Sequence, residues 1–252
     1  MNNLNSSLSN IWTIAKRELG GYFTSPVAYV FIVIFLLMTG LFTFMIGRIL
    51  ERGEASLFWF FYWHPWLYLV LVPAAGMGVW AEERRLGTIE LLLTMPITAW
   101  EAIIGKFIAS WIFLGVALFF TFPVVISVNY LGNPDNGVIL CAYIGSFLLG
   151  GSYLAISTMT SAMTRNQVVS FILSVVICLF LILCGFPPVT DLIQNYLPQV
   201  IIDVIASFSV MPHFDSFKRG LLDFRDIAFF ISIIIFGLFT TSIVIRNLRA
   251  GH

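Results

Sequence analysis

The sequence predicts an all-α integral membrane protein with six transmembrane helices, and two observations carry this prediction. Of its 252 residues, 59% are hydrophobic and only 10% are charged, with a mean hydropathy of +0.95. A chain this apolar cannot hide its hydrophobic surface in one soluble core. The charged residues are also clustered, and the charge-free stretches between the clusters are each long enough for one helical crossing of about 20 residues. These stretches are 19–47, 55–81, 107–134, 136–164, 166–190 and 227–245.

Composition also excludes several classes of protein. The 13 basic and 13 acidic residues balance and form no basic stripe, so nucleic acid is not an expected partner. The spans carry no Asp, Glu, Lys or Arg, which disfavours ion-coupled secondary transport. No P-loop, paired metal ligands or nucleophile and base are visible. We therefore expect no catalysis, cofactor or metal in this chain, and an intramembrane lipid-modifying enzyme is the least favoured alternative.

The six spans are expected near 26–47, 59–81, 107–129, 138–162, 168–186 and 227–245. An even number of spans places both termini on one side of the membrane. With the termini inside, eight basic residues lie on the cytoplasmic side and five on the outer side. Because cytoplasmic loops are enriched in Lys and Arg, this asymmetry predicts that both termini are cytoplasmic.

The segment 1–25 is expected to form a separate helix in the cytoplasmic membrane interface, which we call the elbow helix. Its polar side carries Lys16 and Arg17, and Pro26 favours the start of a new helix directly afterwards. An extension of the first span is the alternative. The apolar residues that recur at helical spacing are Leu8, Ile11, Trp12, Ala15, Leu19 and Tyr22.

The cytoplasmic loop 82–106 predicts a short helix of about two turns. Gly87 can turn the chain, Thr88 can cap the helix, Glu90 suits its positive end and Pro96 prevents its continuation. Thr98 and the residue three positions later, a glutamate, form a capping box for the next helix. A capped apolar helix with so little partner surface of its own is a candidate docking element, and the alternative is that it lies on the membrane surface.

Two further features bear on packing. The outer connection 187–226 holds two amphipathic stretches, 191–197 and 201–208, which are too short to cross and are expected to re-enter the outer leaflet. Span four carries small residues at helical spacing, which allow helices to approach closely. We expect this stripe to pack within one bundle and not in a subunit interface. Its residues are Ala142, Ser146, Gly150, Gly151 and Ala155.

Three segments together resemble a known family. The cytoplasmic loop reads Glu-Arg-x-x-Gly-Thr-Ile-Glu-Leu-Leu-Leu-Thr-x-Pro-Ile-Thr over 83–98, segments 16–19 and 22–30 carry a matching N-terminal pattern, and 212–226 carries a third. The chain resembles the permease subunit of type-2 ABC transporters, closest to the gliding-motility and nitrous-oxide-reductase-maturation type. The match runs through nearly the whole chain, which we take as one permease domain, 1–252.

The resemblance implies a bacterial inner-membrane subunit that works as a homodimer or with a paralogue, together with two separate ATPase subunits that bind ATP and Mg²⁺. A periplasmic auxiliary subunit and membrane lipid are further expected partners. Export of a substrate is the expected function, and relay of force to an envelope partner is the alternative. Permeases of this kind meet through spans one and five, so the expected dimer face includes Ser174 and Cys178. The expected elbow residues are Trp12, Lys16, Arg17 and Glu18, and the expected ATPase-docking residues are Glu83, Arg84, Gly87, Thr88, Ile89, Glu90, Leu91, Leu92, Leu93 and Pro96.

Overall fold

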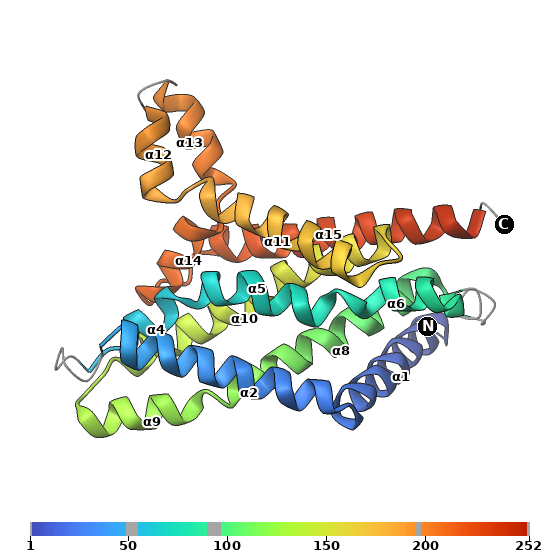
Figure 1. The fold of residues 1–252 in the computed structure, drawn as a ribbon, viewed down its shortest axis with the longest axis horizontal. Helices are drawn as coiled ribbons and strands as arrows, with labels where there is room; N and C mark the ends of the chain where they lie inside the picture. Colours follow the sequence, from blue (N-terminus) through green and yellow to red (C-terminus); the bar gives the residue numbers. More distant parts are fainter. Residues whose placement is uncertain (1, 49–54, 90–96, 195–197, 251–252) are drawn as a thin grey trace.

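The computed structural model describes residues 2–48, 55–89, 97–194 and 198–250, and every regular element in these ranges is a helix. Most of the long helices run along the long axis of the molecule, and both chain ends lie at the same end of the bundle (Figure 1). An even number of membrane crossings would produce this arrangement. We call this the terminal end, and the opposite end, where α4, α9 and α14 lie, the loop end.

Within the described ranges, four helical segments could cross a membrane by length and composition: Pro26–Ile46, Ala99–Leu131, Asn136–Met163 and Phe224–Leu248. They correspond to predicted spans one, three, four and six. The first comprises α2 (Pro26–Leu41) and a π-helical turn (Phe42–Ile46), the second α8 (Ala99–Phe119) and α9 (Phe122–Leu131), the third α10 (Asn136–Met163), and the fourth most of α15 (Phe224–Ala250). Helix α11 (Gln167–Leu183), at predicted span five, is apolar but shorter. The total of six spans stays a prediction.

Predicted span two is not one continuous helix, and its crossing of the membrane stays a prediction. It is divided into α4 (Phe58–Tyr62), α5 (His64–Gly76) and α6 (Gly78–Leu86). Pro73 lies inside α5 and cannot donate a backbone hydrogen bond to the Leu69 carbonyl, which weakens the helix in the turn before the interruption at Met77.

Hydroxyl groups of α10 satisfy the backbone groups at this interruption. Ser157 Oγ donates to the Pro73 carbonyl oxygen over 3.3 Å, and Ser161 Oγ donates to the Met77 carbonyl oxygen over 2.7 Å. Ser161 Oγ also accepts from the backbone N–H groups of Trp80 and Ala81, each over 3.0 Å. A broken helix can persist in an apolar environment when neighbouring side chains meet its freed backbone groups in this way.

The N-terminal segment forms its own helix, α1 (Asn2–Thr24), as predicted. It ends before Ser25, whose Oγ accepts from the Val27 N–H over 3.3 Å and so caps α2, and Pro26 occupies the first turn of α2. The break between the two helices therefore has the local cause that the sequence indicates.

Helix α10 lies at the centre of the core, and the small residues predicted to pack within the bundle do so. Ala142 and Ser146 are at most 1% exposed. A Cβ atom added at Gly151 would lie 2.7 Å from the indole of Trp111, and one added at Gly150 would lie 3.3 Å from the ring of Tyr68. The stripe lets aromatic side chains of α5 and α8 approach the α10 backbone.

The outer connection contains the two short helices that the sequence predicts, α12 (Pro187–Gln194) and α13 (Gln199–Ser207). They project from the side of the bundle near the loop end (Figure 1). Their re-entry into the membrane stays a prediction. A third helix, α14 (Val210–Lys218), was not predicted, and it returns to the bundle with Phe214 and Phe217 completely buried.

Candidate functional site

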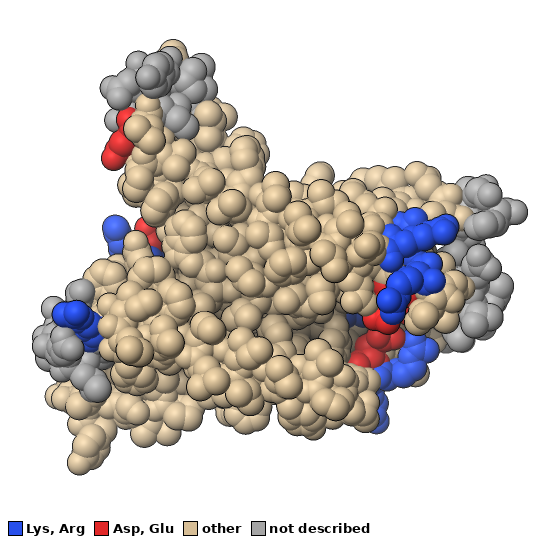
Figure 2. All heavy atoms as spheres, in the orientation of Figure 1, with Lys and Arg blue, Asp and Glu red and all other residues tan. Residues whose placement is uncertain are grey.

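Charged side chains gather at the terminal end of the molecule. On the face that Figure 2 shows, Lys, Arg, Asp and Glu residues cluster at this end, whereas the middle of the body is almost free of them. The end of α6, which carries the predicted docking residues Glu83 and Arg84, and the start of the elbow helix α1 lie at this end, which makes it the candidate functional site.

A buried lysine connects three helices at the terminal end. Lys106, on α8, is only 4% exposed. Its Nζ lies 2.9 Å from Glu83 Oε1 of α6 and 3.2 Å from Glu18 Oε2 of α1. It also lies 5.4 Å from the ring centroid of Trp80, within reach of a cation–π interaction. A buried ammonium needs such partners, so Glu18, Lys106 and Glu83 form one unit that we call the lysine bridge.

The charge of Glu18 is maintained by its neighbours. Burial alone raises the pKa of this carboxyl group, but the positive charge of Lys106 and a 2.9 Å hydrogen bond from Arg17 outweigh burial, and the net pKa lies below the usual value. Glu18 is therefore ionised at neutral pH and attracts Lys106 with its full charge.

The end of α6 is attached to the turn between α10 and α11. Arg84 Nη1 donates to the carbonyl oxygen of Ala162, and Gln167 Nε2 donates to Glu82 Oε2. Glu82 Oε1 also pairs with Arg85 over 3.0 Å. Of the predicted docking residues, Glu83 is part of the lysine bridge and Arg84 contacts α10. Both side chains therefore attach the end of α6 to neighbouring helices.

The chain leaves α6 through the turn predicted at Gly87, which has a φ of +73° that an L side chain rarely adopts. Thr88 Oγ1 donates to the Glu83 carbonyl oxygen over 3.4 Å. Ile89 is buried in a small apolar cluster with Ile103 and Ile245, among others. The other predicted docking residues, Glu90, Leu91, Leu92, Leu93 and Pro96, lie outside the described residues, so the short coupling helix stays a prediction.

The chain enters α8 through the capping box that the sequence predicts. Glu101 N–H donates to Thr98 Oγ1 over 3.3 Å, and Thr98 N–H donates to Glu101 Oε2 over 2.8 Å. Ser7 of α1 donates to the same carboxylate through its Oγ. Both ends of the segment 90–96 are therefore anchored in the bundle.

The elbow helix packs on α8 more closely than the sequence indicates. Ile14 and Ala15 are buried, and a Cβ atom added at Gly105 of α8 would lie 2.8 Å from Ile14 Cγ2. Trp12 and Leu8, predicted on the same apolar face, are 63% and 64% exposed instead. Helix α1 thus has two apolar faces, one against α8 and one turned outward, which suits contact with lipid.

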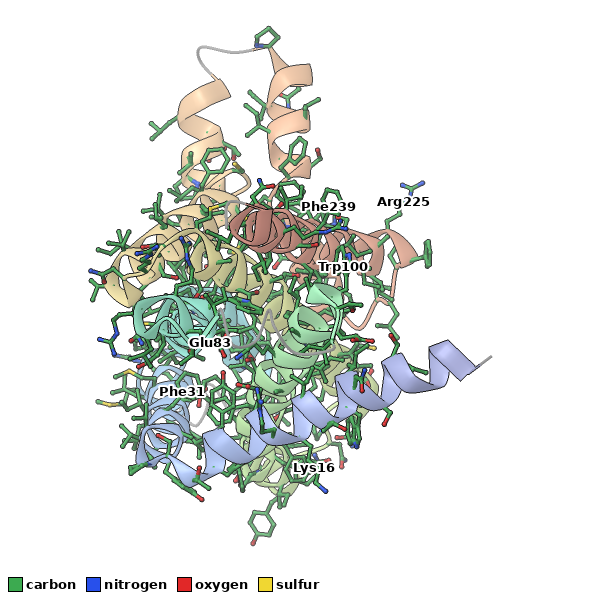
Figure 3. All side chains as sticks on the ribbon, turned by 90° about the vertical axis from the view of Figure 1, so that its right-hand side faces the viewer. Lys16, Phe31, Glu83, Trp100, Arg225 and Phe239 are labelled. Carbon is green, nitrogen blue, oxygen red and sulfur yellow. The ribbon has the colours of Figure 1, made fainter. Side chains whose placement is uncertain are left out.

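The polar elbow residues divide in the same way. Glu18 faces Lys106 in the bridge, whereas Lys16 points away from the bundle (Figure 3). Arg17 is also exposed and pairs with Glu18. Tyr22 OH and Ser110 Oγ lie 2.9 Å apart and complete the attachment of α1 to α8.

The assignment of Ser174 and Cys178 to a dimer face is corrected by the structure. Both side chains are completely buried within the single chain, and Ser174 Oγ lies 2.5 Å from Thr160 Oγ1 of α10. They cannot touch a second subunit in this arrangement. The exposed apolar face of α11 consists of Val168, Val169, Ile172, Leu173, Val176 and Phe180.

Sequence reasoning did not identify Lys106 as a site residue. Its signal was weak, because it appeared only as the last charge before a long apolar stretch. Its partners Glu18 and Glu83 lie far from it along the chain or in a different helix, and no helical periodicity connects them.

Membrane-length apolar helices and a charged end anchored by buried ion pairs define a multi-pass helical membrane protein. Residues 66–218, more than half of the chain, match the family described as ABC-2 family transporter protein. The chain therefore belongs to the ABC-2 transporter family, whose membrane subunits normally pair with an ABC ATPase. No curated protein matches the chain.

Proposed function

We propose that this chain is the transmembrane subunit of an ABC exporter, in which a separate ATPase subunit hydrolyses ATP with Mg²⁺ and drives a substrate across the membrane. The lysine bridge is the observation that carries the proposal. It joins the helix before the docking segment, the helix after it and the elbow helix at one buried charge.

The anchoring at both ends of the docking segment supports a mechanical role. Ile89, before the segment, packs in one apolar cluster with Ala102 and Ile103 of α8, Ala162 of α10 and Ile245 of α15. A displacement of the segment by an ATPase therefore reaches several helices together. Coupling of this kind requires two arrangements of the bundle that the ATPase contacts differently.

We further propose that the subunit functions as a homodimer, or with a paralogue, beside two ATPase subunits in a bacterial inner membrane. Both termini and the docking segment face the cytoplasm in this proposal. The position of both chain ends at the terminal end of the bundle supports it (Figure 1), and so does the excess of basic residues assigned to the cytoplasmic side.

Association with the ATPase tests the proposal. The double variant Leu91→Ser, Leu92→Ser in the full chain should reduce copurification of the ATPase about tenfold, equivalent to about 1.4 kcal/mol. Leu131→Ser, an exposed leucine of α9 at the loop end, is the control and should leave association unchanged. Equal copurification from wild type and the double variant would contradict docking at this segment.

Relay of force to an envelope partner, as in the gliding-motility type, is the second candidate. The projecting α12 and α13 pair, which exposes Leu192, Val204 and Phe208, offers a surface for such a partner. Reconstitution with the ATPase in vesicles distinguishes the two functions. ATP-dependent movement of a lipid, glycan, drug or peptide supports export, whereas ATP hydrolysis without movement of any of them favours relay of force.

A further inference from the structure

A cavity opens beside the lysine bridge, between the C-terminal half of α1, the start of α2, the junction of α5 with α6, and α8. Its volume is about 610 Å³, within the roughly 300–1,000 Å³ of small-molecule sites. Phe31 and Glu83, which both line it, lie close together on the side of the bundle that α1 crosses (Figure 3).

The cavity has an apolar part and a charged part. The apolar lining comes from Ala28, Phe31, Ala74, Ala75, Val79 and Phe113, and the charged lining from Arg17, Glu18, Glu82, Glu83 and Lys106. It lies where the elbow helix meets the first membrane-length helix, at Ser25, which also lines it. The boundary between headgroups and hydrocarbon is expected at this level. The lining therefore suits an amphiphile.

One carboxylate oxygen in the wall of the cavity lacks a donor among the residues that the structure describes. Glu83 Oε2 is buried and has no hydrogen-bond partner among the described residues, while Glu83 Oε1 is held by Lys106. The carboxylates of Glu18 and Glu82 are both paired with basic side chains. A buried charged acceptor without a donor is costly, so a ligand that brings an N–H group satisfies the site.

The same cavity also carries a basic side chain, Arg17, that could bind the anionic phosphate of a ligand. Arg17 lines it with a side chain that is 56% exposed, and a guanidinium group, with five N–H donors, binds phosphate well. The charged part thus offers an acceptor for an ammonium group and a donor for a phosphate group.

We propose that this cavity binds a membrane phospholipid whose headgroup carries a primary ammonium group. The ammonium donates to Glu83 Oε2, the phosphate contacts Arg17, and an acyl chain lies along Phe31, Ala75 and Phe113. The site is independent of whether the protein exports a substrate.

Lipid binding to the delipidated full chain tests the proposal, with native mass spectrometry in the absence of ATPase and nucleotide. Phosphatidylethanolamine and phosphatidylcholine with identical acyl chains are the probes, because both carry a phosphate and a positive charge but only the first has N–H donors. We expect wild type to bind the ethanolamine lipid about tenfold more tightly. Glu83→Gln should bring the two affinities close together.

Two glycines of α1 provide a matched pair of variants. Gly20 and Gly21 are both exposed, and a Cβ atom at either would have no atom within 4 Å, but only Gly21 lines the cavity. Gly21→Leu should weaken both lipids severalfold, and Gly20→Leu should change neither. This pair decides the location of the site even where Glu83→Gln does not fold.

Two outcomes overturn the proposal. Equal affinity of wild type for the two lipids excludes recognition of the ammonium group and indicates unspecific annular lipid. Equal effects of Gly20→Leu and Gly21→Leu place the bound lipid elsewhere. Because no ATPase is present in the assay, either result leaves the proposed export function standing.

Discussion

Lys106 has two carboxylate partners and almost no contact with solvent, so its replacement affects more than one ion pair. Lys106→Met leaves Glu83 without its cation and leaves Glu18 with Arg17 as its remaining basic partner. Removing one partner of a buried ion pair typically costs about 3 kcal/mol or more. We expect the free energy of unfolding to fall by about that amount, measured by thermal or denaturant unfolding in detergent.

Lys16→Met is the matched control for this prediction, because it makes the same chemical change on the exposed side of α1. Its melting temperature should stay within a degree or two of wild type, as for most surface substitutions. Equal melting temperatures for the two variants would show that the bridge contributes nothing to stability.

The lowered pKa of Glu18 predicts how the bridge responds to acid. A carboxyl group whose pKa is lower in the folded than in the unfolded protein stabilises the fold above its unfolded pKa, about 4.5, and this contribution disappears as the pH falls through the folded value. The difference in melting temperature between wild type and Glu18→Gln should therefore be constant near neutral pH and shrink below about pH 4.5. A difference that persists unchanged at pH 3 would contradict the role of Glu18.

At the scale of single helices, one hydroxyl group makes most of the side-chain hydrogen bonds at the interruption after α5. Ser161 Oγ serves the Met77 carbonyl and the N–H groups of Trp80 and Ala81. Ser161→Ala leaves these buried groups without their partner, at a cost of about 1–3 kcal/mol. We expect a lower melting temperature and faster hydrogen exchange at Trp80 and Ala81.

Ser127→Ala provides the comparison, since Ser127 is exposed and donates only to the Pro123 carbonyl within its own helix. Its melting temperature should not change measurably. If both serine variants melt alike, the hydroxyl of Ser161 does not hold the broken helix together.

The elements differ in how far the sequence predicts them, and the reason is physical. Long apolar stretches, the Pro26 helix start, the Gly87 turn and the Thr98 capping box depend on neighbouring residues, so a local pattern is sufficient. The division of span two depends on serines of α10 that lie more than 80 residues away. The pattern of apolar residues cannot contain that information.

The candidate site shows the same limit. Its position at the loop after α6 follows from motif and charge, but the pairing of Glu18 with Lys106 depends on how α1 lies on α8. Helix α1 exposes Trp12 and buries Ile14. The sequence could not predict this choice, because an apolar stripe on a helix does not specify which neighbouring helix it will contact. For the same reason Ser174 and Cys178 face α10 within the chain.

For the whole molecule, the proposed contact with the ATPase depends on the predicted orientation in the membrane, in which the terminal end is cytoplasmic. Thr13 is exposed at the terminal end and Asn133 is exposed in the turn between α9 and α10 at the loop end. In a background without the native Cys141, Cys178 and Cys184, we expect an impermeant maleimide to label Asn133→Cys in intact cells. Thr13→Cys should react only after permeabilisation.

The reverse labelling pattern would place the docking segment outside the cell and contradict the proposed ATPase contact. Labelling of both positions from the same side would mean that an even number of crossings separates them. The three predicted spans between Thr13 and Asn133 would then be wrong. A third cysteine at the exposed Leu86, beside the docking segment, should behave like Thr13→Cys.

The attachment of α1 to α8 has a consequence for synthesis of the chain. Tyr22 and its partner Ser110 are 88 residues apart, and a ribosome adding about 5–20 residues per second needs several seconds to cover that distance. Until α8 has emerged, Glu18 lacks its partner Lys106, and Ile14 lacks the α8 surface at Gly105 on which it packs. Helix α1 is therefore translated seconds before the helix on which it packs, and it reaches its final position only after α8 has been made.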